Sequence, residues 1–254
     1  MNAGIPISVV IITRNEERNI KDALESVRDF DDIIVVDSFS EDRTAEICRE
    51  YTTRVYRHEW SGFSRQKQRA VDYAKNEWVF ILDADERVTS GLKAEMMREI
   101  SASLHSGFYI PRKNFFLGRW IRYSGWWPDY TLRLFRKELS YVEPREVHEK
   151  VIVNGTTAYL NSPMLHYTYR TISDYMKKME TYSTLSAEEI RQSKGLFPGF
   201  KLLINPFLVF IKMYFLRQGF RDGAHGFILA VLYAVQTFLK YAKVIEKNLS
   251  FPRN

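Results

Sequence analysis

The segment WVFILDADE, residues 78–86, places acidic side chains directly after an apolar run. The run predicts a buried β-strand, so Asp83 and Asp85 follow the point where that strand ends. Carboxylates at the carboxyl end of a parallel strand lie in the crevice where open α/β sheets bind ligands. The Asp-x-Asp spacing suits a hard divalent cation that also holds phosphate. The simpler alternative is an acidic pair in a solvated turn or helix cap.

Two earlier β-branched runs also end in polar residues. Residues 7–13, ISVVIIT, finish at Thr13, and residues 32–37, DIIVVD, finish at Asp37. Each run is followed by a helical pattern, which predicts parallel strands joined by crossover helices. We therefore expect Thr13, Asp37 and the two aspartates of WVFILDADE at one edge of one sheet.

The wider pattern divides the chain into three parts. Residues 1–100 predict a nucleotide-binding half with strands near 7–13, 32–36, 53–57 and 78–82 and helices near 18–28, 42–50, 64–75 and 90–100, the last capped by Thr89 or Ser90. Residues 101–168 predict short strands and an aromatic, loop-rich composition that suits sugar recognition. The strands are expected to be broken at Pro111, Gly118, Gly125, Pro128 and Pro144, with Trp120, Trp126 and Trp127 crowded between them. Residues 169–254 predict a helical extension.

Five segments carry a family resemblance. TRNEE (13–17), VVDSFSEDRT (35–44) and LDADE (82–86), in this order, resemble the family 2 glycosyltransferases, whose GT-A fold is a Rossmann-like α/β nucleotide-sugar fold. GWWPDYTLRLFRK (125–137) and EVHEK (146–150) are similar to the branch that adds glucose to heptose in the lipopolysaccharide core. The resemblance covers nearly the whole chain. It implies an inverting, metal-dependent transferase that uses UDP-glucose and a lipid-linked saccharide acceptor.

The resemblance also implies residues that bind the donor. Thr13 and Asp37 take the positions that hold the nucleobase and ribose, and Glu16 is a further candidate. Asp37 has the alternative of capping the turn SFSED, but Ser38, Ser40 and Asp42 offer caps of their own, which favours the donor role. The alternative for Glu16 is a helix first-turn acid.

One predicted helix presents a basic side chain to the donor. By resemblance Lys67 faces the donor, while Gln68 stands where similar enzymes usually have asparagine. Arg65 and Arg69 are equally compatible with a solvated basic face.

The resemblance implies a metal site for Mg²⁺ or Mn²⁺. Asp83 would reach the ribose or a metal-bound water, and Asp85 would ligate the ion directly. His148 of the tripeptide VHE would be a second ligand, and its nitrogen would favour Mn²⁺. Such an ion bridges the two phosphates and offsets the charge on the departing nucleoside diphosphate.

Asp129 is the candidate general base. An inverting transfer needs a carboxylate that deprotonates the acceptor hydroxyl on the face opposite the leaving group. Asp129 follows Trp127-Pro128, which stiffens an apolar loop, although an aspartate after proline is also a common turn residue. Arg133 is expected to pair with Asp129 or with the diphosphate.

Composition and charge restrict the class of protein. With 254 residues, 45% apolar and 27% charged, the chain is an ordinary folded protein rather than a disordered one. The single cysteine, Cys48, excludes an internal disulfide and fits a reducing compartment. No basic stretch precedes the first apolar run, so we expect no signal peptide and a cytoplasmic protein.

The positive charge gathers in the extension. Residues 191–247 contain nine Lys or Arg against two acids, a net +7 in a chain whose total is +6. The cations alternate with apolar residues instead of forming a polar stripe, which favours an anionic membrane surface and argues against nucleic acid. The uncharged run 223–239 has 17 residues, about 25 Å as a helix, against a hydrocarbon core of about 30 Å.

These lengths favour helices that lie in the membrane plane or insert shallowly, at the cytoplasmic face of the inner membrane. A spanning hairpin, a buried helical pair and an oligomer interface are the alternatives. Two other functions also compete with the main one. A polyprenyl-phosphate glycosyltransferase would share the fold, and a non-catalytic sugar-nucleotide or glycan-binding module would lack the carboxylates of the base or the metal site.

Overall fold

The computed structural model describes residues 4–102, 104–144, 150–192 and 198–250. The chain divides into two compact units. The first comprises Met1–Lys113 and Asp129–His166, and the second comprises Asn114–Pro128 and Tyr167–Asn254.

The first hundred residues form the predicted alternation of strands and helices. In order these are β1 Ile5–Thr13, α1 Ile20–Glu25, β2 Phe30–Asp37, α2 Thr44–Tyr51, β3 Val55–Arg57, α3 Phe63–Asp72, β4 Trp78–Ile81, β5 Glu86–Arg87 and α4 Ser90–Ala102. The predicted positions are confirmed to within a few residues. Thr89 caps α4, since its Oγ1 accepts a hydrogen bond of 3.2 Å from the backbone N–H of Leu92.

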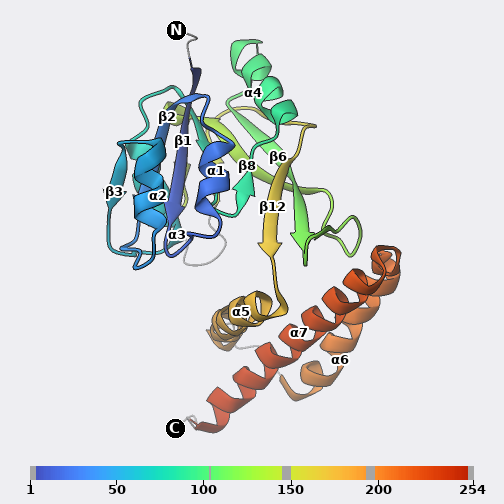
Figure 1. Cartoon of the computed structure of the whole chain (residues 1–254). Coiled ribbons are helices and arrows are strands. Elements are labelled where there is room, and N and C mark those ends of the chain that lie inside the picture. The colour runs from blue at the N-terminus through green and yellow to red at the C-terminus, as the bar shows by residue number, and fades with distance from the viewer. Residues whose placement is uncertain (1–3, 103, 145–149, 193–197, 251–254) are drawn as a thin grey trace. The chain divides into compact units, whose positions relative to one another are not determined.

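The strands join in one mixed sheet with the order β3-β2-β1-β4-β8-β6-β12-β5 (Figure 1). β1 runs parallel to β2 and to β4, and β2 runs parallel to β3. Val9 and Ile11 of β1 pack with α1, α2 and α4, whereas Val10 packs with α3 on the other face. Successive strand residues point to opposite faces, so helices on both sides bury a continuous apolar strand.

The remaining strands are β6 Gly107–Phe116, β7 Arg119–Trp120, β8 Asp129–Arg136, β9 Ser140–Val142, β10 Val151–Val153, β11 Thr157–Tyr159 and β12 Met164–Tyr169, with the 3₁₀ turn η1 Lys137–Leu139 after β8. Of these strands, β6, β7, β8 and β12 extend the sheet through antiparallel pairs, β11 pairs parallel with β6, and β9 and β10 form a separate antiparallel pair. The expectation that Pro111 interrupts a short strand was wrong. Pro111 lies inside the ten-residue strand β6 and pairs with Tyr130 of β8. Asp129 likewise opens a strand instead of lying in a free loop.

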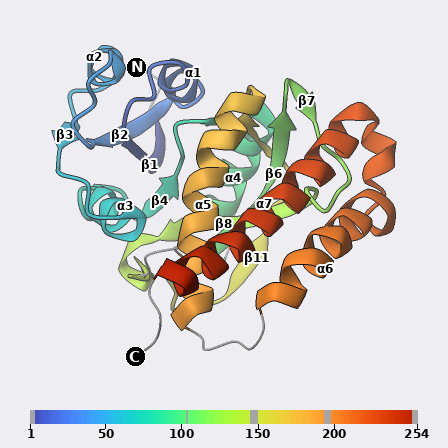
Figure 2. The same cartoon turned by 90° about the horizontal axis from the view of Figure 1, so that it is seen from below.

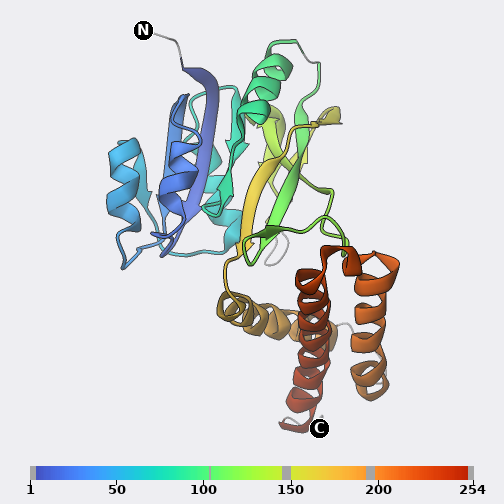
Figure 3. The same ribbon diagram turned by 45° about the vertical axis from the view of Figure 1, so that its right-hand side comes forward.

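The second unit is mainly helical, as the sequence predicts. It contains α5 Ile172–Gln192, α6 Pro198–Ile211, the π-helical turn η2 Lys212–Leu216, the 3₁₀ turn η3 Gly219–Asp222 and α7 Ala224–Ser250. Helices α6 and α7 lie side by side and run antiparallel (Figures 2 and 3). Trp126, expected in a sugar-binding segment, is 9% exposed and packs in this unit's core with Phe116 and Tyr175.

Helix α7 corrects the length argument made from the sequence. It continues past the uncharged run, and residues Ala224–Lys247 are long and apolar enough to cross a membrane by length and composition. Only 22% of the most apolar window is buried. The length of α7 therefore does not exclude a membrane-spanning helix. Whether α7 spans a membrane or lies in its plane depends on how polar and apolar residues are distributed around it.

Candidate active site

The acidic turn after β4 is closed by its own glutamate. The backbone N–H of Asp83 donates to Glu86 Oε2 at 3.0 Å, and the N–H of Glu86 donates to the Asp83 carbonyl at 2.9 Å. Glu86 is completely buried and begins β5. The turn is thus held from both ends, and it carries Asp83 and Asp85 at the end of β4.

Two cations meet the carboxylate of Asp83. Lys67 Nζ, on α3, lies 3.0 Å from Asp83 Oδ1, and Arg133 Nη2, on β8, donates to Asp83 Oδ2. Burial favours the neutral acid, but the charges of Arg133 and Lys67 outweigh it and hold the pKa of Asp83 well below its usual range. Asp83 is therefore a permanent anion at neutral pH, and both cations are largely buried beside it.

A continuous series of ion pairs connects this aspartate with the candidate base. Arg133 Nη2 also lies 2.8 Å from Glu86 Oε1, which Arg112 Nη1 approaches to 3.4 Å. Arg112 Nη2 in turn lies 2.7 Å from Asp129 Oδ2. We call this series the ion-pair chain; its members are Lys67, Asp83, Arg133, Glu86, Arg112 and Asp129.

The surroundings of Asp129 differ from the expected apolar loop. Its cross-strand partner in the β6–β8 ladder is Arg112, and the two side chains form the ion pair of the chain. The expected partner, Arg133, contacts Asp83 and Glu86 instead. Asp129 remains 31% exposed, so a ligand can reach its carboxylate.

Asp85 faces a histidine that the sequence did not single out. Asp85 Oδ2 lies 3.5 Å from His166 Nε2, and His166 of β12 pairs with Glu86 of β5 in an antiparallel ladder. A carboxylate oxygen and an imidazole nitrogen this close together are ligand types that suit one divalent ion. Within the described ranges no three His, Cys, Asp or Glu side chains gather as a complete metal site. His148 lies outside the described residues.

Thr13 and Asp37 end adjacent strands, as predicted, and are paired in the β1–β2 register. The fully buried Asp37 accepts hydrogen bonds from the backbone N–H and the hydroxyl of Ser40, and Arg57 Nε lies 3.6 Å away. It therefore does cap the turn, which was the alternative role. The Thr13 hydroxyl is buried without a hydrogen-bond partner in the described structure. Nucleobase binding by this pair stays a prediction.

Glu16 lies in the turn before α1 and not in its first helical turn. Its carboxylate accepts a hydrogen bond of 2.8 Å from Asn19 Nδ2, and its backbone N–H donates to Thr44 Oγ1 at 2.7 Å. These bonds tie the loop after β1 to the start of α2. A donor contact by Glu16 stays a prediction.

Gln68 of α3, which stands where similar enzymes usually have asparagine, contacts a neighbouring strand. Lys67 is buried and points to Asp83, whereas Gln68 Oε1 accepts a hydrogen bond of 2.7 Å from the backbone N–H of Val142. The glutamine thus holds β9 against the helix. Arg65 is exposed, which agrees with a solvated basic face.

Three residues of the site escaped the sequence analysis, namely Glu86, Arg112 and His166. Glu86 was visible as the third acid of the motif, but only its burial reveals that it closes the turn. Arg112 and His166 come from antiparallel strands, whose register the sequence does not supply. Arg112 and Lys113 interrupt the apolar residues of 107–116, and cations inside such a strand are the signal that points to residues of this kind.

Comparisons with known proteins show the family of this chain. Residues 8–157 match the family described as Glycosyl transferase family 2. The chain is 31% identical to the lipopolysaccharide core biosynthesis glycosyltransferase LpsC of Rhizobium meliloti, over 96% of this chain and 93% of the relative. It is 30% identical to an uncharacterized glycosyltransferase of Rickettsia typhi, over 96% and 88% of the two chains.

Among solved structures, the S. aureus TarS fragment 1–349 in complex with UDP-GlcNAc superposes with a TM-score of 0.50 at 16% identity, covering 97% of this chain and 93% of that one. This likeness concerns the fold alone. The chain belongs to glycosyl transferase family 2 and has the GT-A fold. It is a glycosyltransferase, as the resemblance of its motifs predicted.

Proposed function

We propose that this enzyme is an inverting, metal-dependent glycosyltransferase that moves glucose from UDP-glucose to a lipid-linked saccharide, such as a heptose of the lipopolysaccharide core. The observation that carries the proposal is the ion-pair chain, which joins Asp83 of the acidic turn to the partly exposed Asp129 within one unit. The name of the Rhizobium relative supports the acceptor, and the UDP-GlcNAc held by TarS makes UDP-sugars the first donors to test.

The proposed reaction transfers one proton and exchanges one bond at carbon 1 of the sugar. Asp129 accepts the proton of the acceptor hydroxyl while that oxygen attacks carbon 1 of the hexose. The bond from carbon 1 to the phosphate oxygen breaks, and its electron pair leaves with the nucleoside diphosphate. Arg112 holds the Asp129 carboxylate in place, and Lys67 supplies positive charge near the diphosphate.

The metal is assigned to the acidic turn. Asp85 with His148 would hold Mg²⁺ or Mn²⁺, and His166 offers a second nitrogen beside Asp85. When bound, the ion would act as a Lewis acid and stabilise the negative charge on the leaving group. Thr13, Glu16 and Asp37 would hold the uridine, and Arg133 would fix Asp83 against the ribose.

The lipid-linked acceptor places the enzyme at a membrane. We assign it to the cytoplasmic face of the inner membrane, as a peripheral or shallowly inserted protein. The basic, apolar helices of the second unit support this location.

The function is tested by incubating the purified protein with a panel of nucleotide sugars, with and without EDTA, and measuring released UDP or GDP. We expect UDP to be released from UDP-glucose, faster when a heptose-bearing lipid extract is added. This release should stop in EDTA. Binding of nucleotide sugars without any release would indicate a non-catalytic module. Stimulation of UDP release by polyprenyl phosphate alone would indicate a polyprenyl-phosphate glycosyltransferase.

A further inference from the structure

Helix α7 exposes an apolar stripe. Phe227, Val231, Val235 and Phe238 are 47%, 36%, 39% and 42% exposed. Their spacing of four, four and three residues places them on one side of the helix. A helix that faces water normally carries charged or polar side chains at such positions, so this side indicates an apolar partner.

The opposite side of α7 packs on α5, through apolar contacts of Leu229 and through polar contacts further along the helix. Lys243 Nζ lies 2.7 Å from Glu180 Oε1 and 2.9 Å from Ser183 Oγ. Lys247 Nζ lies 2.7 Å from Glu188 Oε1, and Gln236 accepts a hydrogen bond of 2.9 Å from the Tyr175 hydroxyl. At 3.6 residues per turn, positions 236, 243 and 247 lie roughly opposite the apolar stripe.

These polar and charged contacts are incompatible with lipid all around the helix. Helix α5 exposes Lys177, Lys178 and Glu180, so water must reach the side of α7 on which α5 packs. Burying these charges in hydrocarbon is costly, whereas a helix lying in the interface keeps one side wet and one side in lipid.

An aromatic cluster continues the apolar surface at the start of α7. Phe215, Phe220 and Phe227 are about half exposed, and all three rings contact Tyr214 at centroid distances of 5.1, 6.3 and 5.6 Å. Exposed aromatic rings favour the boundary between headgroups and acyl chains.

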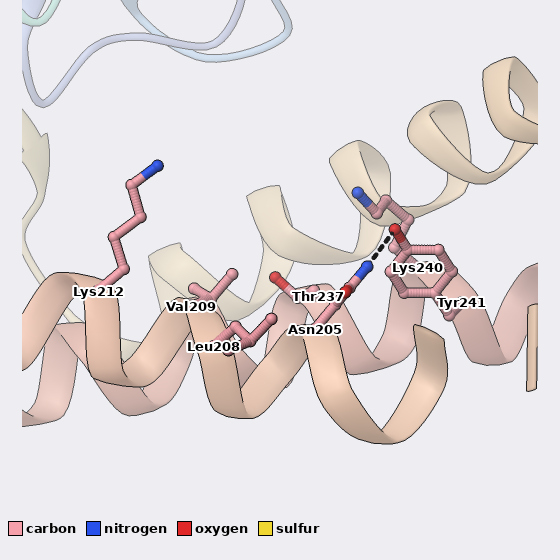
Figure 4. Close-up of a pocket in the computed structure, with 7 residues that line it drawn as sticks. All are labelled: Asn205, Leu208, Val209, Lys212, Thr237, Lys240 and Tyr241. Atoms are coloured by element: carbon pink, nitrogen blue, oxygen red, sulfur yellow. Dashed lines mark hydrogen bonds between the residues drawn. The ribbon is translucent and has the colours of Figure 1, made fainter. Parts of the chain in front are cut away.

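Positive charge accompanies the aromatic cluster. Lys212, Arg217 and Arg221 lie in or directly after the turns η2 and η3, which carry Phe215 and Phe220, and all three are exposed. A groove of about 220 Å³ between α6 and α7 is lined by Lys212 and Lys240 (Figure 4), and position 240 lies on the side of α7 opposite the apolar stripe. The cations of η2 and η3 are the ones that lie in the same turns as the exposed aromatic rings. Each such cation contributes on the order of 1 kcal/mol near an anionic leaflet. The combination selects an anionic lipid surface over an uncharged protein surface.

We propose that α7 lies in the plane of an anionic bilayer, with the stripe of Phe227, Val231, Val235 and Phe238 among the lipids and its α5 side in water. The proposal decides against a spanning α7 and deepens the membrane part of the proposed function. It makes no use of the catalytic residues, so its tests can fail while transfer to a soluble acceptor persists.

The first test uses vesicles of phosphatidylglycerol and phosphatidylcholine. The double variant V231D/V235D should bind at least 10-fold more weakly than wild type. As a matched control, M97D/L139D changes two exposed apolar residues of the first unit, 45% and 38% exposed, and should bind like wild type. Equal binding by all three proteins, or no binding by wild type, overturns the proposal. UDP release by each variant without lipid reports separately on the active site.

The second test distinguishes an in-plane helix from a spanning one. Cys48 is fully buried, and burial raises the pKa of its thiol to about 12, so it stays unreactive in the folded protein. Single cysteines introduced as R221C and E246C then report on the two ends of α7. In sealed inverted membrane vesicles, an impermeant maleimide should modify both. If either cysteine reacts only after detergent opens the vesicles, α7 spans the membrane and the proposal is wrong.

Discussion

The guanidinium of Arg112 lies 2.7 Å from the carboxylate of Asp129, its cross-strand partner, and the same side chain reaches Glu86 of the acidic turn at 3.4 Å. Asp129 is therefore tethered to the element that carries Asp83 and Asp85. Ion pairs join the candidate base to the candidate donor site. A substitution at either end of the ion-pair chain should therefore affect the other end.

Arg112 is predicted to be a positioning residue. Arg112→Met should lower kcat by about 10- to 100-fold, because Asp129 loses its tether and small displacements of reacting groups are costly. KM for the donor should change little. Arg112→Lys should restore part of kcat, since a lysine keeps the charge without the fork that reaches two carboxylates. Steady-state kinetics with a fixed acceptor separate the two constants. Unchanged kcat in the Met variant would refute the role.

The metal assignment is predicted to rest on Asp85. Asp85→Ala should nearly abolish transfer, and His148→Ala should raise the Mn²⁺ concentration needed for half-maximal rate. Mn²⁺ binding followed by electron paramagnetic resonance gives a readout independent of turnover. Full activity of either variant in EDTA would show that the site holds no essential ion.

Asp83 is predicted to stabilise the fold in a pH-dependent way. Asp83→Asn should lower the free energy of unfolding at pH 7 by about 3 kcal/mol, because Lys67 and Arg133 stay buried without their carboxylate. The pKa of Asp83 is lowered by folding, so its contribution is complete above the unfolded value of about 3.9 and is lost as the pH falls below it.

Urea unfolding at several pH values checks this prediction. The difference between wild type and Asp83→Asn should be largest near neutral pH and should shrink in acid. The exposed Glu138, changed to Gln, serves as control and should follow wild type throughout. A difference that grows as the pH falls would contradict the lowered pKa.

The sequence predicted the parts of the fold that depend on local pattern. Strands such as β1 and β4 are apolar runs that end in polar residues, so their position and the sheet edge of Thr13, Asp37 and Asp83 could be inferred. Pro111 was misread, because a proline in a strand is harmless where the sheet does not use its missing N–H, and that depends on register.

The parts that depend on antiparallel register could not be inferred. Arg112 and His166 enter the site from β6 and β12, far along the chain from the acidic turn. Trp126 is the type of residue expected in a sugar-binding surface, but tertiary packing places it in the core of the helical unit. Hydrophobicity alone does not distinguish these two environments.

The most direct test of the proposed mechanism is the rate of UDP release from UDP-glucose by Asp129→Asn in the presence of acceptor. The asparagine keeps the volume of the side chain but cannot accept the proton, so turnover should fall by roughly 10²-fold or more while UDP binding is retained. Glu138→Gln should turn over like wild type. If Asp129→Asn releases UDP as fast as wild type, Asp129 is not the base and the proposed mechanism is wrong.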